Sequence, residues 1–239
     1  MTPKKKVALF IVEGFNDQIA LAMPLEKLLT SESVKFEFTG GDFTSDYSGK
    51  DIAAKIGDCI KKHCAEYKYT KEDFLEVVLL VDMDGAYIND DFILHSDDHN
   101  TPYYNSCSIL CISPEKLKKT HIHKQRNLNR LTSLPAVWSI PFSVYFFSCN
   151  LDHVICGDAN LSQVEKSKVA RRFEANYTAN PAGFLAFFRS DDIFVNSSYS
   201  ESWDFIKKNN NSLSRCSNLS VFLSPMAPRV QRAFPNESK

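Results

Sequence analysis

The chain has 239 residues, of which 44% are hydrophobic and 24% are charged. These ordinary globular values exclude fibrous, collagen-like and disordered classes, and no run of about 18 apolar residues predicts a membrane span. The 28 basic residues nearly balance the 29 acidic ones, so any nucleic-acid contact must come from a local basic patch. At about 150 residues per domain, the length predicts one large domain, or one domain with an appendage.

The basic and apolar residues at the start of the chain superficially resemble a signal peptide. The apolar run at residues 7–12 is short and stops at Glu13, and no small-residue cleavage site follows, so we interpret it as a strand. The seven cysteines form no C-x2-C pair, and we expect reduced thiols in a cytoplasmic protein. The alternative is a structural zinc site built from scattered side chains, namely His63, Cys64, His121, His123 and His153.

Strand and helix patterns alternate over the first 85 residues. In chain order, the sequence predicts a buried strand at Lys6–Val12, a helix at residues 16–29 with Asn16 as N-cap, a half-exposed strand at 34–38, a turn at 39–42, a helix at 51–67 and a buried strand at 76–81. Pro24 would kink the first helix. This alternation favours an α/β fold with a mostly parallel sheet and helices on both faces.

The pattern changes in the second half of the chain. Two more strands are predicted at residues 108–112 and 143–147, and helices at 161–177, Pro181–Phe188 and 200–208. We place a boundary near residue 156, between an α/β core at 1–156 and a helical C-terminal region at 157–239. The tail at 224–239 contains three prolines and is expected to be loosely held.

Acidic residues follow two of the predicted buried strands. Glu13 comes directly after the first strand, Gly14 allows a sharp turn, and Asp17 lies in the first turn of the next helix. Asp82 and Asp84 follow a later strand, and in an extended stretch residues i and i+2 point to the same side. Because the carboxyl ends of parallel strands form one edge of a sheet, we expect these carboxylates to converge there.

Converging carboxylates would repel one another, and a hard cation such as Mg²⁺ or Mn²⁺ would relieve that repulsion. Taken separately, a glutamate after a strand and an Asp-x-Asp turn are both common features of solvated surfaces. A second acidic stretch is interpreted as a solvated loop, with a supplementary metal ligand as its alternative; its members are Asp90, Asp91, Asp97 and Asp98.

The runs FIVEGFND and LLVDMDG together resemble the Toprim domain, which topoisomerases, primases, OLD nucleases, recombination proteins and some ribonucleases share. That domain has a glutamate after its first strand and an Asp-x-Asp after a later one, and Glu13, Asp82 and Asp84 match these positions. The resemblance covers roughly residues 6–155 and is strongest for the nuclease and primase branches. It implies a Toprim-like, Rossmann-like sheet, with Glu13 serving in acid/base transfer as well as in metal placement.

A third run, FFSCNLDHVI, resembles a segment of RloB-type abortive-infection Toprim proteins, in which Ser-Asn precedes an acidic residue. Here Asp152 stands in place of the glutamate, and His153 follows where those proteins have Trp-rich apolar sequence. The resemblance implies that Asp152 is another metal ligand; the alternative is that Asn150 or Asp152 only caps a helix. It also implies an effector of anti-phage defence that works with an ABC-type ATPase.

Residues 116–130 are strongly basic, and no acidic residue occurs from 116 through 151. A basic strip beside a carboxylate centre would hold a phosphodiester backbone. The alternative is a solvated helix face or loop. The candidate nucleic-acid-binding residues are Lys116, Lys118, Lys119, Lys124, Arg126 and Arg130.

These features lead to a first hypothesis of a nuclease in which Mg²⁺ or Mn²⁺ activates water. Glu13, Asp82 and Asp84 would be catalytic and would hold the metal with Asp17 and Asp152, and Lys124 or Arg126 would neutralise the non-bridging oxygens. The second hypothesis is a non-catalytic Toprim-fold partner or regulator of an ATPase, docking through the helical C-terminal region. A third is a phosphatase of the haloacid-dehalogenase type, since VDMDG also resembles the nucleophilic-aspartate strand of those enzymes.

Overall fold

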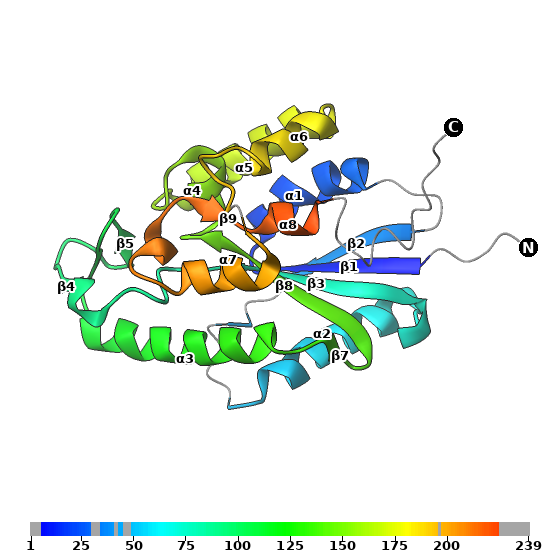
Figure 1. Cartoon of the computed structure of the whole chain (residues 1–239), viewed down its shortest axis with the longest axis horizontal. Coiled ribbons are helices and arrows are strands. Elements are labelled where there is room, and N and C mark those ends of the chain that lie inside the picture. Colours follow the sequence, from blue (N-terminus) through cyan, green and yellow to red (C-terminus); the bar gives the residue numbers. More distant parts are fainter. Residues whose placement is uncertain (1–5, 30–33, 41–42, 45–48, 196, 225–239) are drawn as a thin grey trace, which may run out of the picture.

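The computed structural model describes residues 6–29, 34–40, 43–44, 49–195 and 197–224 (Figure 1). The predicted turn at 39–42 lies partly outside the described residues, and the predicted tail lies outside them except for residue 224. The described chain is an α/β structure in which a mostly parallel sheet is flanked by helices on both faces. The predicted fold class is therefore confirmed at this level.

The central sheet has the strand order β2-β1-β3-β8-β7, and β9 pairs with β8 outside that path. β1, β2, β3 and β8 are mutually parallel, whereas β7 and β9 run antiparallel to β8. The central strands are almost continuously apolar because both faces of the sheet are covered. Their bounds are β1 Lys6–Val12, β2 Val34–Gly40, β3 Phe74–Asp82, β7 Ala136–Val137, β8 Ile140–Ser148 and β9 Cys216–Ser217.

One face of the sheet is covered by helices from both ends of the chain. Phe10, Leu80 and Phe147 of the strands share one buried cluster with Leu21 and Phe173 of the helices. The helices of this layer are α1 Phe15–Leu28, α4 Leu151–Cys156, α5 Gln163–Thr178, α6 Pro181–Phe188 and α8 Leu219–Phe222 (Figure 1).

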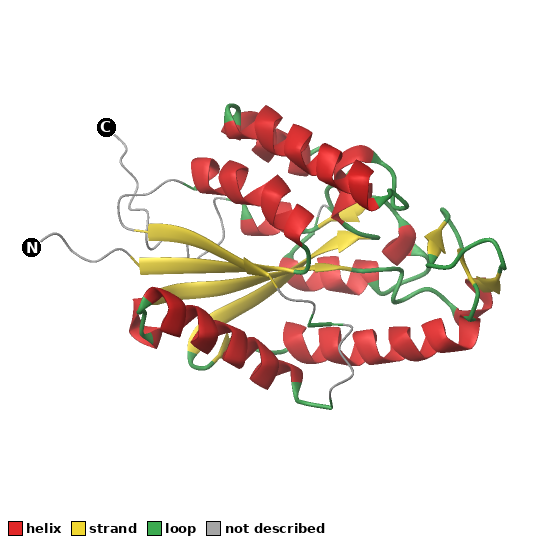
Figure 2. Ribbon diagram, turned by 180° about the vertical axis from the view of Figure 1, so that it is seen from behind, coloured by secondary structure: helices red, strands yellow, loops and turns green. Residues whose placement is uncertain are grey.

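The opposite face packs against a second helical layer, visible below the sheet in Figure 2. Ile11 and Leu79 of the strands share a buried cluster with Ile56, Leu128 and Trp203 of the helices. The helices of this layer are α2 Ile52–Tyr67, α3 Pro114–Thr132 and α7 Tyr199–Ile206. The described chain also contains the short 3-10 turns η1 Lys71–Asp73, η2 Asp90–Phe92 and η3 Asn211–Leu213.

A second, three-stranded sheet lies beyond the carboxyl end of β3. Its order is β4-β6-β5, and its strands are β4 Ile93–His95, β5 Tyr103–Tyr104 and β6 Ile109–Cys111. The strand predicted at 108–112 therefore exists, but it belongs to this small sheet and not to the central one. A separate apolar cluster that includes Ile93, Ile109 and Leu213 supports it.

The described part of the C-terminal region contains α5, α6, α7 and α8 together with the strand β9, and it completes the central core. Ser217 of β9 pairs with Phe147 of β8, and Phe222 of α8 packs edge-on against Phe10 of β1.

The start of α1 differs from the prediction, because its N-cap is Gly14 and not Asn16. Asp17 explains the shift, because its carboxylate accepts a hydrogen bond from the Gly14 N–H at 2.8 Å.

Candidate functional site

Glu13 and Asp82 meet at the carboxyl edge of the central sheet. Glu13 directly follows β1 and Asp82 ends the neighbouring parallel strand β3, and Glu13 Oε2 accepts a hydrogen bond from the Asp82 N–H at 3.1 Å. The Thr44 hydroxyl donates to Glu13 Oε1 at 2.5 Å, so both carboxylate oxygens have a protein partner. The prediction that these two acids converge is confirmed.

Asp84 reaches the same edge from a turn and not from an extended stretch, which corrects the expected geometry. Its φ is +49°, Gly85 follows with φ +67°, and the Asp84 N–H donates to the Cys149 carbonyl at 2.7 Å. A Cβ on Gly85 would lie 2.6 Å from Cδ1 of Ile109, so this turn requires glycine. The turn thus fixes the direction in which the Asp84 carboxylate points.

A buried lysine holds the acids on the α3 side of the site. The side chain of Lys124 is 1% exposed; its ammonium group donates to Asp84 and lies 3.8 Å from Glu13 Oε2. Burial by itself would lower the pKa of Lys124, but Asp84 and Glu13 outweigh burial and raise it. The Tyr104 hydroxyl lies 3.4 Å from Asp84 Oδ1. Lys124 is therefore a charged counter-ion inside the acidic site.

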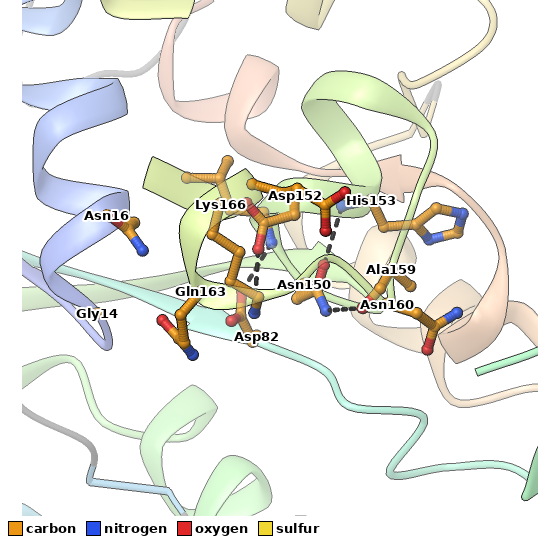
Figure 3. A network of polar contacts seen from close by, with 12 residues as sticks. Gly14, Asn16, Asp82, Asn150, Asp152, His153, Ala159, Asn160, Gln163 and Lys166 are labelled. Carbon is orange, nitrogen blue, oxygen red and sulfur yellow. Dashed lines mark hydrogen bonds and ion pairs between the residues drawn. The ribbon is translucent and has the colours of Figure 1, made fainter. Parts of the chain in front are cut away.

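A second lysine holds the acids on the α5 side, as Figure 3 shows. Lys166 Nζ lies 3.1 Å from Asp152 Oδ2, and Asp82 Oδ1 accepts the Leu151 N–H at 3.0 Å. Burial tends to lower the pKa of Lys166, and Asp152 more than compensates, so the pKa is raised. Lys166 was not predicted from the sequence, because a single lysine in an amphipathic helix carries no distinguishing pattern.

Asn150 caps α4, as one sequence alternative proposed. Its Oδ1 accepts the His153 N–H at 2.9 Å, and its Nδ2 donates to the Ala159 carbonyl at 2.9 Å. Asp152 has a different role, since its side chain is 8% exposed and faces Lys166. Asn150 therefore ties the start of α4 to the loop that follows it.

The gathered acids perturb one another electrostatically. Burial, reinforced by the charges of Asp17, Asp84 and Glu13, raises the pKa of Asp82 well above its ordinary value. Burial also raises the pKa of Asp17 to about 6, and Asp152 adds to this shift. Among the described residues, Lys124 and Lys166 form ion pairs with Asp84, Glu13 and Asp152. The raised pKa values of Asp82 and Asp17 show that the carboxylates still repel one another, so the ionised site is strongly negative.

This donor set suits a hard divalent cation in chemistry and in charge, because carboxylate oxygens are the ligands that Mg²⁺ and Mn²⁺ prefer. The positions of these side chains do not form a ready-made metal-binding cage. Among the described residues, no group of three His, Cys, Asp or Glu side chains is placed to hold a metal ion. The same finding applies to the zinc alternative, because the described His and Cys side chains form no such group. All seven cysteines are free thiols, as expected.

The basic segment forms α3, but its charges do not form a single strip beside the acids. Lys124 lies on the buried stripe of the helix with His121 and Leu128. Helical geometry turns Lys119, Arg126 and Arg130 to the opposite, exposed side, and Lys116 is exposed on the flank of the helix. Arg130 lies 3.9 Å from Asp51 Oδ2. Lys118 pairs with the neighbouring Glu115 at 3.0 Å. The predicted basic residues are therefore divided between two sides of α3: Lys124 lies beside the carboxylates, and the exposed charges remain a predicted contact for nucleic acid.

The second acidic stretch is solvated, as predicted, but it contains the 3-10 turn η2 and the strand β4 and is not a simple loop. Asp90, Asp91, Asp97 and Asp98 are all exposed, and Asp97 lies 3.2 Å from the ring of His95. None of the four contributes to the site at the central sheet.

No protein-family model, curated protein or solved structure matches this chain. The Toprim resemblance therefore remains a prediction from short motifs. Within the described ranges, no helix has both the length and the apolar character needed to cross a bilayer.

Proposed function

We propose that this protein is a Mg²⁺- or Mn²⁺-dependent nuclease that hydrolyses phosphodiester bonds in RNA, such as tRNA, or in DNA. The observation that carries the proposal is the contact between Glu13 and Asp82, which brings two distant motifs to one sheet edge. Asp84, Asp17 and Asp152 add negative charge at that edge, and the excess charge favours a cation.

In this proposal, Glu13, Asp82 and Asp84 hold the metal, with Asp17 and Asp152 completing the set on the α5 side. A bound divalent ion supplies an activated water and stabilises the charge that develops on the phosphate. Glu13 accepts and returns the proton of the attacking water. Lys124 is a buried cation beside Asp84 and Glu13, and in this proposal it neutralises a non-bridging phosphate oxygen.

The surroundings of the site extend this proposal to substrate and context. The exposed basic side of α3 contacts the nucleic-acid backbone at a distance from the reacting phosphate, with Lys116, Lys119, Arg126 and Arg130 as its charges. Because of the motif resemblance, we further propose that the nuclease is an effector of anti-phage defence that works with an ABC-type ATPase.

One observation favours the second candidate function, a non-catalytic partner or regulator of an ATPase. Lys124 and Lys166 already form ion pairs with Asp84 and Asp152, so the acids can serve as a structural network. Under this alternative, the site contributes to the fold and the chain acts through its surface.

The decisive experiment incubates the purified chain with labelled tRNA, single-stranded DNA and plasmid, in Mn²⁺ or in EDTA. We expect cleavage only with Mn²⁺, and Glu13→Gln should reduce it by about a hundredfold or more, a typical loss for a proton-transfer group. Glu66→Gln, at an exposed position of α2, is the matched control and should cleave normally. Folded protein with no Mn²⁺-dependent cleavage of any substrate would contradict the nuclease proposal. Hydrolysis of an aryl phosphate instead would favour the phosphatase hypothesis.

Thermal unfolding separates the nuclease from the structural alternative without a substrate. If the acids bind a divalent cation, Mn²⁺ should raise the melting temperature of the wild-type chain and have a smaller effect on Glu13→Gln. If the acids are only an ion-pair network, Mn²⁺ should shift both proteins equally or not at all.

A further inference from the structure

A cavity of about 490 Å³ opens beside the acidic site, on the side away from Lys166. Its walls come from β5, the loop after α4 and the segment before β9, which are far apart in the sequence. The lining includes Tyr104, Asn105, Ser106, His153, Asn160 and Arg215. Figure 3 shows His153 and Asn160 on one side of Asn150, with Asp82 and Lys166 on the other.

The cavity and the acids share two walls. Tyr104 lines the cavity, and its hydroxyl lies 3.4 Å from Asp84 Oδ1. Cys149 also lines the cavity, and its carbonyl accepts the Asp84 N–H at 2.7 Å. A molecule in the cavity would therefore contact residues that themselves contact Asp84.

Hydrogen bonds hold these walls in place. Asn160 exchanges two hydrogen bonds with the Tyr104 backbone, at 2.8 and 2.9 Å. Arg215 donates to the carbonyls of His153 and Val154, with distances from 2.8 to 3.1 Å, and so the guanidinium group is fixed against the last turn of α4. A ligand would bind to a largely pre-formed surface and lose little ordering entropy.

The lining chemistry matches a nucleotide. A volume of this size lies in the usual range for small-molecule sites. Amide and hydroxyl groups of Asn105, Ser106 and Ser214 supply donors and acceptors for a base edge, and Tyr104 and Leu213 supply apolar surface for its faces. Arg215 adds a positive charge suited to a phosphate. Asp158 also lines the cavity, and its carboxylate is an acceptor for a sugar hydroxyl or a base amino group.

We propose that this cavity binds one nucleotide of the substrate strand, adjacent to the phosphodiester that faces Asp82 and Asp84. The inference rests on the proposed nuclease function and deepens it, because it assigns a base-binding subsite to a chain whose sequence shows no stacking motif. The substrate strand must present an unpaired nucleotide at this position, so single-stranded segments and loops are favoured over intact duplex.

The first test measures binding in EDTA, so that no cleavage occurs. Fluorescence anisotropy compares a labelled single-stranded oligonucleotide with the same oligonucleotide carrying abasic positions. Ser106→Trp fills the exposed mouth of the cavity, and Ser200→Trp, on the exposed side of α7, is the matched control. We expect abasic substitution and Ser106→Trp each to weaken binding about fivefold to a hundredfold, as the loss of one stacked base does. The two losses should not add, and Ser200→Trp should bind like the wild type.

A second measurement needs no variant, in case Ser106→Trp does not fold. Oligonucleotides with one photoreactive base are cross-linked to the wild-type chain, and the modified peptides are identified. We expect cross-links within residues 103–107, 157–160 or 213–215. Cross-links confined to other surfaces, or equal binding by wild type and folded Ser106→Trp, would overturn the proposal.

Two further outcomes separate this inference from the nuclease proposal. Mn²⁺-dependent cleavage that is insensitive to Ser106→Trp would overturn the cavity assignment and leave the nuclease standing. Binding that is sensitive to Ser106→Trp, without cleavage, would support the cavity and remove the nuclease. A titration with free nucleoside monophosphates distinguishes the source of the nucleotide: binding of these alone, with no effect on the oligonucleotide, would overturn the assignment to the substrate strand.

Discussion

On each side of the acidic site a lysine forms an ion pair with a carboxylate, but the two lysines differ in burial. On the α3 side, Lys124 is 1% exposed and faces both Asp84 and Glu13. On the α5 side, Lys166 is 26% exposed and pairs with Asp152. Asp82 lies between them and is hydrogen-bonded to both sides, through its own N–H to Glu13 and through the Leu151 N–H.

The comparison shows that two lysine–carboxylate pairs of the same kind can differ in their contribution to the stability of the fold. A buried ammonium ion has lost its hydration and depends on its carboxylate partners, whereas a partly exposed one can turn to water. The α3 side is therefore the more rigid half of the site, and the α5 side is the half that can rearrange at low cost.

The largest expected loss of stability follows replacement of Lys124, and the same replacement of Lys166 is the comparison. Lys124→Met leaves buried carboxylates without their counter-ion and should lower the free energy of unfolding by about 3–5 kcal/mol. Lys166→Met should cost about 1 kcal/mol, because water can replace the ammonium group. Urea denaturation of both variants at pH 7.5 in EDTA measures the difference. Equal losses would show that the two sides are not distinct.

The second effect concerns Asp17 and has a defined pH dependence. Its pKa is raised from 3.8 to about 6, so the folded protein holds this proton more tightly than the unfolded chain does. Ionised Asp17 therefore destabilises the fold: the free energy of unfolding falls as pH rises from about 4 to 6 and stays lowered above that.

Asp17→Asn removes this charge and keeps an oxygen that can accept the Gly14 N–H. It should raise the free energy of unfolding at pH 7.5 by up to about 3 kcal/mol, and the gain should largely disappear at pH 4. Urea denaturation at the two pH values measures both quantities, with the exposed Asp191→Asn as control. A gain that is independent of pH would contradict the electrostatic explanation.

The smallest effect on stability is expected on the outer side of α3. Lys119→Gln with Arg126→Gln should change the free energy of unfolding by less than about 0.5 kcal/mol per substitution, since both residues are exposed. If this side contacts phosphates, the pair should reduce the slope of log binding constant against log salt by about 0.7–0.9 per lost contact. An unchanged slope would remove α3 from the substrate path.

Much of this architecture could be predicted from local patterns in the sequence. Apolar runs predicted β1, β3 and β8, and periodic apolar residues predicted α1, α2, α5 and α6, because strand and helix periods are local properties. The meeting of Glu13 and Asp82 also followed from sequence, since strands joined by helices run parallel and end at one edge.

The remaining features depend on contacts between distant segments. The turn that carries Asp84 and the small sheet around Ile109 were not predictable, because each packs against side chains from distant parts of the chain. The N-cap of α1 is a different case, since it depends on the local hydrogen bond between Gly14 and Asp17, which the Asn16 prediction overlooked. The direction of Lys124 is a clear case: as a sequence feature it belonged to a basic run, but the helix position turned it inward.

The sequence by itself therefore determined the main strands and several helices of the two layers, the α/β class and the carboxylates at the sheet edge, whereas α3 and the short strands β4, β5, β7 and β9 were not predicted. Only the tertiary structure decided which cations neutralise those carboxylates, and that a cavity opens next to them. The physical reason is range: periodicity and strand polarity act within one or two elements, whereas the partners of a buried charge and the walls of a cavity depend on how α3, α5 and the segment before β9 pack together.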